Sequence, residues 1–280
     1  LQSTYNRFVR FLNKNHLTTN GDFLFSDLTS EILISFERSM KEDFLTHNTT
    51  SFYLRILRSY YNKGIREGLY FSFTDPFKNV YTGISRTKKR AIEKDIFIKL
   101  KEVKLPDKLN FARDIFLFSF FMRGMSFVDI SKLTASNIFG EELKYCRTKT
   151  GQTIRIRIEP CARDILNKYI RKSGDEHLFP IVCNGGKRLK YNTSLKNMNT
   201  HLKKISRILG LEKPITTYTA RHSWASIAKK GGIPISTISE GMGHTSERTT
   251  MIYLSSLNQS TIDDANRLII RSLNQRKEKY

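Results

Sequence analysis

Three side chains that can handle a phosphate ester follow one another in the last quarter of the chain. Arg221 is followed after 23 residues by His244, and Tyr253 comes 9 residues later. A guanidinium binds non-bridging phosphate oxygens in pairs, an imidazole donates or accepts a proton, and a tyrosine hydroxyl serves as a nucleophile. These residue types, in this order, predict covalent attack on a phosphate ester.

The arginine is expected on a helix that starts near Tyr218 and stops at Gly231. Thr216 or Thr217 is the expected cap at its start. Tyr218 and Arg221 lie three positions apart, so they would share one face of this helix. The tyrosine is therefore a candidate phosphate contact, with packing as the equally weighted alternative.

Two further segments must aim the histidine and the tyrosine. His244 follows a Gly-Met-Gly turn, so backbone geometry rather than packing would direct its imidazole. Ser246 is the expected cap of a short helix that leads to Tyr253. An amphipathic helix over residues 261–273 and a basic tail would close the chain.

An alternating segment upstream predicts a β-hairpin that carries a lysine at its tip. Residues 154–158 alternate isoleucine with arginine, and residues 143–147 are the expected partner strand. Lys149 lies in the turn between them and can reach into an active site. Lys144 and Arg147 on the same hairpin compete with it for this role.

Composition points to a polyanionic partner. The 280 residues contain 48 Lys and Arg against 26 Asp and Glu, a formal charge of +22. A membrane surface is the weaker alternative, because the basic residues are spread along the chain, without a lipidation motif. Apolar runs such as residues 115–122 are too short to span a bilayer. No signal peptide is visible and the cysteines Cys146, Cys161 and Cys183 form no metal-spaced pair, so we expect a cytoplasmic, nucleoid-associated protein.

Apolar spacing divides the chain into two helical parts. Residues 1 to about 75 show three apolar stripes at helical spacing, and the second stripe follows the cap candidates Thr29 and Ser30. A break with Pro76, Gly83 and a basic cluster at residues 86–90 predicts a linker. In the second part, residues 110–122 predict a central buried helix. Helices at 91–103, 161–171 and 192–209 and a loop around 184–186 are also expected.

The site segments resemble the tyrosine recombinase (phage integrase) family. The family pattern is a His-x-x-Arg helix, a Leu-Gly-His turn and a tyrosine nine residues later. Ala-Arg-His-Ser-Trp-Ala-Ser (220–226), Met-Gly-His-Thr-Ser (242–246) and Arg-Thr-Thr-Met-Ile-Tyr (248–253) are similar to it in order and spacing. The sequences of these three segments are most similar to those of integrases of the Bacteroides type.

The resemblance covers nearly the whole chain and implies a mainly α fold in two domains. Residues 1–80 would form a helical core-binding domain that contacts DNA, and residues 81–92 a basic linker. Residues 93–280 would form a mostly helical catalytic domain with a small antiparallel β-sheet. Its last helix would be exchanged between protomers, or fold back on its own domain.

The resemblance also implies a role for each site residue. Tyr253 would attack a backbone phosphate, forming a 3′-phosphotyrosine and releasing a 5′-hydroxyl. Arg221 would hold the phosphate oxygens, His244 would hydrogen-bond the phosphate in the transition state, and Lys149 would protonate the leaving oxygen. The phosphotyrosine conserves the bond energy, so the family's chemistry implies no metal, cofactor or ATP.

The chain departs from the family pattern at two positions. The family's first arginine normally follows a Gly-Met or Gly-Leu pair, but Ser126 stands there, and the nearest arginine is Arg123. We expect Arg123 to reach the same phosphate and Ser126 to be the N-cap of a helix that begins with Phe-Val-Asp129. Tyr218 stands where the family usually has histidine, and a phenol is no base at neutral pH.

The resemblance implies a site-specific recombinase, an integrase or invertase of a mobile genetic element. Its partners would be double-stranded DNA with specific core sites, three further protomers in a homotetramer, and accessory DNA-bending proteins. A type IB topoisomerase, which relaxes DNA by similar chemistry, is one alternative. A DNA-binding protein with a decayed active site is the other, based on Ser126 and Tyr218.

Overall fold

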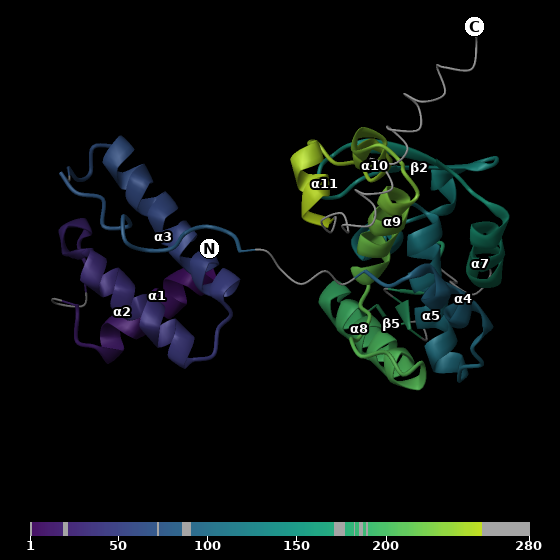
Figure 1. Ribbon diagram of the computed structural model, residues 1–280, viewed down its shortest axis with the longest axis horizontal. Coiled ribbons are helices and arrows are strands. Elements are labelled where there is room, and N and C mark those ends of the chain that lie inside the picture. The colour runs from purple at the N-terminus through teal and green to yellow at the C-terminus, as the bar shows by residue number, and fades with distance from the viewer. Residues whose placement is uncertain are drawn as a thin grey trace, which may run out of the picture. The chain divides into compact units, whose positions relative to one another are not determined.

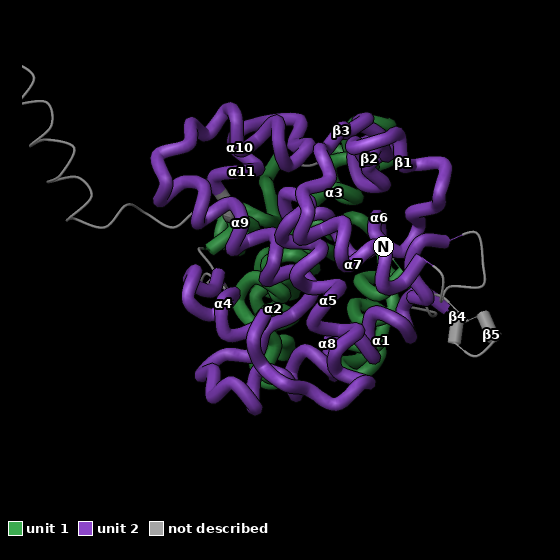
Figure 2. The backbone as a smooth tube through the Cα atoms, turned by 90° about the vertical axis from the view of Figure 1, so that its right-hand side faces the viewer, with its two compact units in different colours: residues 1–88 green, residues 89–280 purple. Residues whose placement is uncertain are grey.

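The chain divides into two compact units, residues 1–88 and residues 89–280 (Figures 1 and 2). Each unit buries its own hydrophobic core. The structure is a computed structural model. It describes residues 2–18, 22–71, 73–85, 91–170, 177–181, 183–184, 187–188 and 190–253.

Unit 1 is built from helices that follow the three predicted apolar stripes. Leu33, Phe36 and Leu54 are fully buried at the centre of its core. Thr29 caps the second helix, because its side chain accepts a hydrogen bond from the backbone of Ile32, which confirms the predicted cap. The elements are α1 (Gln2–Lys14), a 3₁₀ turn (Phe25–Asp27), α2 (Ser30–Glu42) and α3 (His47–Arg66).

The segment after α3 folds back on unit 1. Ser51 donates a hydrogen bond to the carbonyl of Gly83, and the side chain of Asn48 bonds both backbone groups of Ser85. The predicted basic cluster at residues 86–90 lies outside the described residues.

Helix α5 (Asp107–Phe121) is the centre of unit 2, as its apolar sequence predicts. It packs against α7, α8 and α9 (Figure 1), and its residues 115–118 are all buried. A helix that is apolar on every side needs such surrounding partners. The other helices are α4 (Lys94–Glu102), α6 (Phe127–Ile130), α7 (Pro160–Ile170), α8 (Tyr191–Ile208), α9 (Thr219–Lys230), α10 (Ile235–Gly241) and α11 (Glu247–Tyr253), with a 3₁₀ turn at Ala135–Asn137.

The predicted hairpin is present as β2 (Glu142–Cys146) and β3 (Thr153–Arg157). The strands are antiparallel, with Leu143 opposite Ile156 and Tyr145 opposite Ile154, and these four side chains are buried. A short strand, β1 (Ile138–Phe139), extends the sheet on the β2 side and was not predicted. The mostly helical fold with a small antiparallel sheet is thus confirmed.

The loop expected around residues 184–186 is wrong in part. β4 (Cys183–Asn184) and β5 (Lys187–Arg188) pair as a second, two-stranded sheet. Strands of two residues are too short to show an alternating pattern, so periodicity cannot detect them. The amphipathic helix expected over residues 261–273 lies outside the described residues.

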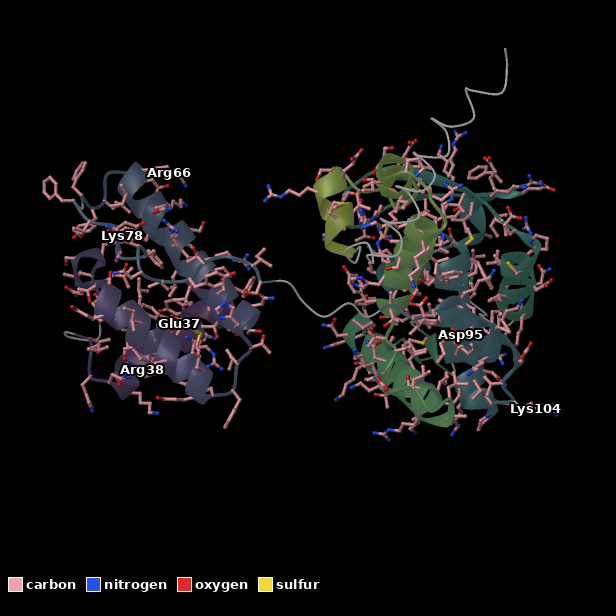
Figure 3. All side chains as sticks on the ribbon, viewed as in Figure 1. Glu37, Arg38, Arg66, Lys78, Asp95 and Lys104 are labelled. Atoms are coloured by element: carbon pink, nitrogen blue, oxygen red, sulfur yellow. The ribbon has the colours of Figure 1, made fainter. Side chains whose placement is uncertain are left out.

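Figure 3 shows the side chains of both units and labels Arg66 and Lys78 of unit 1 and Lys104 of unit 2, which are exposed. Within the described residues, no helix is both long and apolar enough to cross a membrane.

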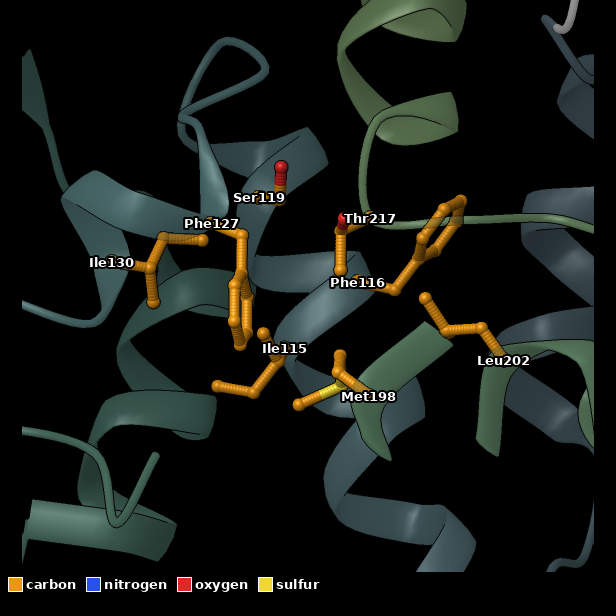
Figure 4. A pocket seen from close by; sticks show the side chains of 8 residues that line it. All are labelled: Ile115, Phe116, Ser119, Phe127, Ile130, Met198, Leu202 and Thr217. Atoms are coloured by element: carbon orange, nitrogen blue, oxygen red, sulfur yellow. The ribbon is translucent and has the colours of Figure 1, made fainter. Parts of the chain in front are cut away.

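The core of unit 2 contains one small apolar cavity beside α5 (Figure 4). Its accessible volume is about 10 Å³, the lower limit for one water molecule. It is lined by Ile115, Phe116, Ser119, Phe127, Ile130, Met198, Leu202 and Thr217. The cavity is too small for any substrate.

Candidate active site

Arg221 is a buried arginine on α9 whose guanidinium is held by backbone carbonyls. Its side chain is 2% exposed. Nη1 donates to the carbonyl of Gly124 over 2.8 Å, and Nη2 donates to the carbonyl of Met242 over 2.5 Å. The arginine therefore joins the end of α5 to the turn that carries His244.

Gly124 permits this arrangement because a side chain there would collide with α9. A Cβ on Gly124 would lie 2.8 Å from the Cα of Arg221, and its φ of +71° is in the left-handed region. Both constraints favour glycine. The Gly-Met pair noted in the sequence thus brings the end of α5 directly against the arginine.

His244 lies between Arg221 and α11. Its Nε2 is 3.0 Å from Nη2 of Arg221, and its Nδ1 is 2.8 Å from the hydroxyl of Thr250. A guanidinium can only donate, so Nε2 accepts and Nδ1 carries the proton that is donated to Thr250. The histidine is therefore tied to the helix that ends at Tyr253.

The protonation state of His244 is set by its surroundings. Its pKa is lowered from 6.5 to about 3, first by burial and then by the positive charges of Arg221, Arg147 and Lys149. Burial and neighbouring cations both disfavour the charged imidazolium. The imidazole is therefore neutral at physiological pH in the absence of a bound anion.

Tyr253 is the last residue of α11, a helix that packs against α9 and α10. Its side chain lies outside the described part of the structure. The backbone nevertheless places Tyr253 one helical turn after Thr250, the partner of His244. The position of its hydroxyl relative to the other site residues stays a prediction.

Lys149 lies exposed in the turn of the β2–β3 hairpin. Its charge is one of the causes of the low pKa of His244, which brings the hairpin turn into the electrostatic neighbourhood of the site. The turn is held in place by Asp129 on α6, whose Oδ1 accepts a hydrogen bond from the backbone of Thr148 over 2.9 Å.

Arg147 is buried beside the site. The sequence predicted it only as an alternative to Lys149 for the basic residue that reaches the active site. It is 4% exposed, and its Nη1 donates a hydrogen bond to the carbonyl of Gly243. Its charge also lowers the pKa of His244. It therefore lies at the junction between the hairpin and the Gly-Met-Gly turn.

Arg123 lies beside Gly124, the glycine whose carbonyl binds Arg221. It is a partly buried non-glycine residue with a φ of +56°, a conformation that costs L-residues energy. Its Cδ approaches the backbone of Gly241, 3.8 Å from where a Cβ there would lie. Arg123 is thus brought close to the backbone segments that hold Arg221.

Ser126 is the N-cap of α6, as predicted. Its Oγ accepts a hydrogen bond from the backbone of Asp129 and donates one to the Asp129 carboxylate over 2.6 Å. The cap and the attachment of Thr148 therefore share one carboxylate. The local sequence pattern indicates the capping role of Asp129 but not its contact with the hairpin.

The start of α9 differs from the prediction. The helix begins at Thr219, so Tyr218 is its N-cap residue, without a side-chain capping bond, and neither Thr216 nor Thr217 holds that position. Tyr218 is 47% exposed and its ring contacts the ring of His222 edge to face at 4.7 Å. Tyr218 is therefore exposed to solvent, whereas Arg221, three positions later, is buried.

Trp224 on α9 is partly buried and packs against the cluster of Ala225, Ile238 and Met242. Among the described residues, no group of three or more His, Cys, Asp and Glu side chains could hold a metal ion.

Comparison with known proteins shows which family the chain belongs to. The profile of the Phage integrase family matches residues 107–260, and that of the Phage integrase SAM-like domain matches residues 1–80. Tyrosine recombinase XerD of Halalkalibacterium halodurans is 24% identical over 241 residues, which cover 81% of this chain and 77% of the relative.

Solved structures share the fold. A lambda integrase tetramer bound to a Holliday junction has a TM-score of 0.67 and 16% identity, covering 91% of this chain and 72% of the other. The Tn1549 transposon integrase in complex with a circular intermediate DNA has a TM-score of 0.68 and 14% identity, covering 94% of this chain and 91% of the other. Because the integrase profile spans more than half of the sequence, the chain belongs to the phage integrase family, and its activity is tyrosine-type site-specific DNA recombination.

Proposed function

We propose that the chain cuts and rejoins DNA at specific sites through a phosphotyrosine at Tyr253. The tyrosine oxygen forms a bond to phosphorus while the bond from phosphorus to the 5′ oxygen breaks. Lys149 gives a proton to the leaving 5′ oxygen, and the tyrosine proton leaves to solvent. Rejoining reverses these steps with the 5′-hydroxyl of the partner strand as the nucleophile.

The observation that carries this proposal is the cationic setting of His244. Burial, and then the positive charges of Arg221, Arg147 and Lys149, hold its pKa low, and such a concentration of positive charge suits a bound phosphate. A phosphodiester would compete with His244 for Nη2 of Arg221 and offset the cationic field. The imidazole Nε2 could then be protonated and donate to a phosphate oxygen.

Arg123 is our candidate for the second phosphate arginine. Its backbone directly precedes the glycine that binds Arg221, and its strained φ is typical of residues retained for function. Tyr218 is exposed at the start of the same α9 helix, so its hydroxyl can donate one hydrogen bond to DNA. We propose that Tyr218 contacts DNA but takes no part in the proton transfers of the reaction.

We assign DNA binding by the core-binding domain (residues 1–80) to a basic groove of unit 1 between α1 and α2. Its lining includes Arg7, Arg10, Lys14 and Arg38 together with the acidic Glu42 and Asp43, and Asp43 pairs with Arg7. Guanidinium and ammonium groups along one groove suit a phosphate backbone. Residues 93–280 would form the catalytic domain, joined to it by the basic linker at residues 81–92.

The assembly on DNA is proposed to be a homotetramer. The related lambda integrase structure is a tetramer bound to a Holliday junction. The predicted helix at residues 261–273 would dock on a neighbouring protomer. Accessory DNA-bending proteins would assist the assembly, and a chromosomal substrate would place it at the nucleoid in the cytoplasm.

Covalent capture from random sequence tests the proposed specificity. Nicked duplexes with randomised arms are incubated with the protein, and DNA that remains bound after denaturation is sequenced. We expect one enriched motif, and no relaxation of a supercoiled plasmid that lacks it. Relaxation of that plasmid without motif enrichment would indicate a type IB topoisomerase instead.

A further inference from the structure

Arg147 is a buried charged residue that the reaction steps above do not use. Burying a guanidinium is costly unless its donors are bonded. Nη1 bonds the carbonyl of Gly243, yet Nε is buried with no hydrogen-bond partner in the described part of the chain. A buried arginine with an unmet donor calls for a functional reason.

The main chain of Arg147 closes the turn that carries Lys149. Its N–H donates to the carbonyl of Gln152 over 2.9 Å, and its carbonyl accepts from Gly151 over 2.9 Å and Thr150 over 3.2 Å. Lys149 lies inside the loop that these bonds close. A displacement of Arg147 would therefore displace the lysine.

The side chain of Arg147 binds the carbonyl of Gly243, the residue before His244. Gly243 has a φ of +63°, and a Cβ there would overlap the side chain of Ile154 on β3. The hydroxyl of Thr150 also lies 3.5 Å from the Gly243 carbonyl. The backbone that aims His244 thus rests directly on the hairpin.

We propose that Arg147 is a positioning residue that fixes the Lys149 turn relative to the His244 turn. The backbone of Arg147 closes the Lys149 turn, and its guanidinium binds the carbonyl of Gly243 in the His244 turn. The inference rests on the proposed roles of Lys149 and His244 in strand cleavage. Proton donors must be aimed closely, since a misplacement of about 1 Å can lower a rate about 100-fold.

Single-turnover cleavage of a nicked duplex carrying the captured motif tests this role. Arg147→Gln removes the charged fork, Arg147→Lys keeps a cationic donor, and Arg155→Gln is the matched control at an exposed arginine of β3. We expect Arg147→Gln to cleave about 100-fold more slowly while its Kd for DNA changes less than about threefold. Arg147→Lys should remain within about tenfold of wild type, and the control should match wild type.

A substrate with sulfur at the bridging 5′ position separates positioning from direct phosphate contact. A thiolate leaves without a proton, so it bypasses a badly aimed Lys149. We expect Arg147→Gln to cleave this substrate at least about tenfold faster than it cleaves the ordinary oxygen substrate. Lys149→Ala should show the same gain. Absence of this rescue, wild-type cleavage by Arg147→Gln, or an equal loss in binding and cleavage would overturn the inference.

Two controls keep the result interpretable. The fluorescence of Trp224, the only tryptophan of the chain, reports whether unit 2 of each variant is folded. If Arg147→Gln does not fold, Arg147→Lys is tested in its place. Its cleavage rate should fall by a smaller factor, and the sulfur substrate should again raise that rate. Failure of the wild-type protein to form any adduct would instead count against the proposed function.

Discussion

Arg221 donates a hydrogen bond from Nη2 to Nε2 of His244 over 3.0 Å, and this contact fixes the tautomer of the histidine. The same imidazole donates from Nδ1 to Thr250 on the helix that ends at Tyr253. The two residues that would grip the phosphate are therefore bonded to each other before DNA arrives. Binding of the phosphate must exchange this contact for new ones.

The buried neutral state of His244 predicts a loss of stability in mild acid. Below pH 6.5 the unfolded chain protonates this histidine, whereas the folded pKa is about 3, so protons favour unfolding. This effect alone should lower the free energy of unfolding by about 2 kcal/mol between pH 7 and pH 5. Urea unfolding followed by Trp224 fluorescence should show a flatter pH dependence for His244→Gln. Equal pH slopes would show that His244 is not held neutral.

Gly124→Ala should disturb Arg221 through the backbone. A methyl group would lie 2.8 Å from the Cα of Arg221 and would force a φ of +71° on alanine. We expect a loss of about 2 kcal/mol or more in unfolding free energy, and cleavage slowed beyond the effect on DNA binding. Gly210→Ala is the control, since its φ is +64° with open space around it, and should cost only about 1 kcal/mol. Similar costs for the two variants would contradict the tight contact.

Asp129→Ala should slow cleavage because the backbone N–H of Thr148 loses its acceptor and the Lys149 turn loosens. Ser126→Ala is the comparison, because it removes the cap but leaves the Thr148 bond. It should cost about 1 kcal/mol of stability and leave the cleavage rate nearly unchanged. Equal cleavage by the two variants would show that Asp129 serves only as a cap partner.

Arg123 offers a test that separates its side chain from its strained backbone. Arg123→Gly removes both, whereas Arg123→Ala keeps the unfavourable φ. If the guanidinium stabilises the transition state, both variants should cleave about 100-fold more slowly, with a smaller effect on binding. The glycine variant should also be more stable than the alanine variant, by about 1 kcal/mol. An equal loss in binding and cleavage would make Arg123 an ordinary DNA contact.

The sequence predicted those parts of the fold whose signal is local and repeated. Helix α5 contains a dense apolar run over residues 115–121 and the β2–β3 hairpin alternates strictly, so both were recognised. The two-residue strands β1, β4 and β5 hold too few positions to show a period. The start of α9 near Tyr218 was predicted to within one residue, but its cap was not, because Thr216 and Thr217 have the side chains that usually cap a helix and Tyr218 does not.

The candidate site was predictable as a set of residue types but not as a set of contacts. The spacing of Arg221 and His244 pointed to a shared task, and the structure joins them directly. The parts played by Asp129 and Arg147 depend on hydrogen bonds to residues 19 and 96 positions away. No local pattern encodes such pairings, because they arise only when separate elements pack together.

The central claim is that Tyr253 becomes covalently joined to DNA. The protein is incubated with a nicked duplex of the captured motif, from which the short released strand diffuses away so that rejoining is blocked. After digestion, mass spectrometry should find a 3′-nucleotide on the peptide that contains Tyr253, and Tyr253→Phe should form no adduct. An adduct on another residue, or adduct formation by Tyr253→Phe, would contradict the account.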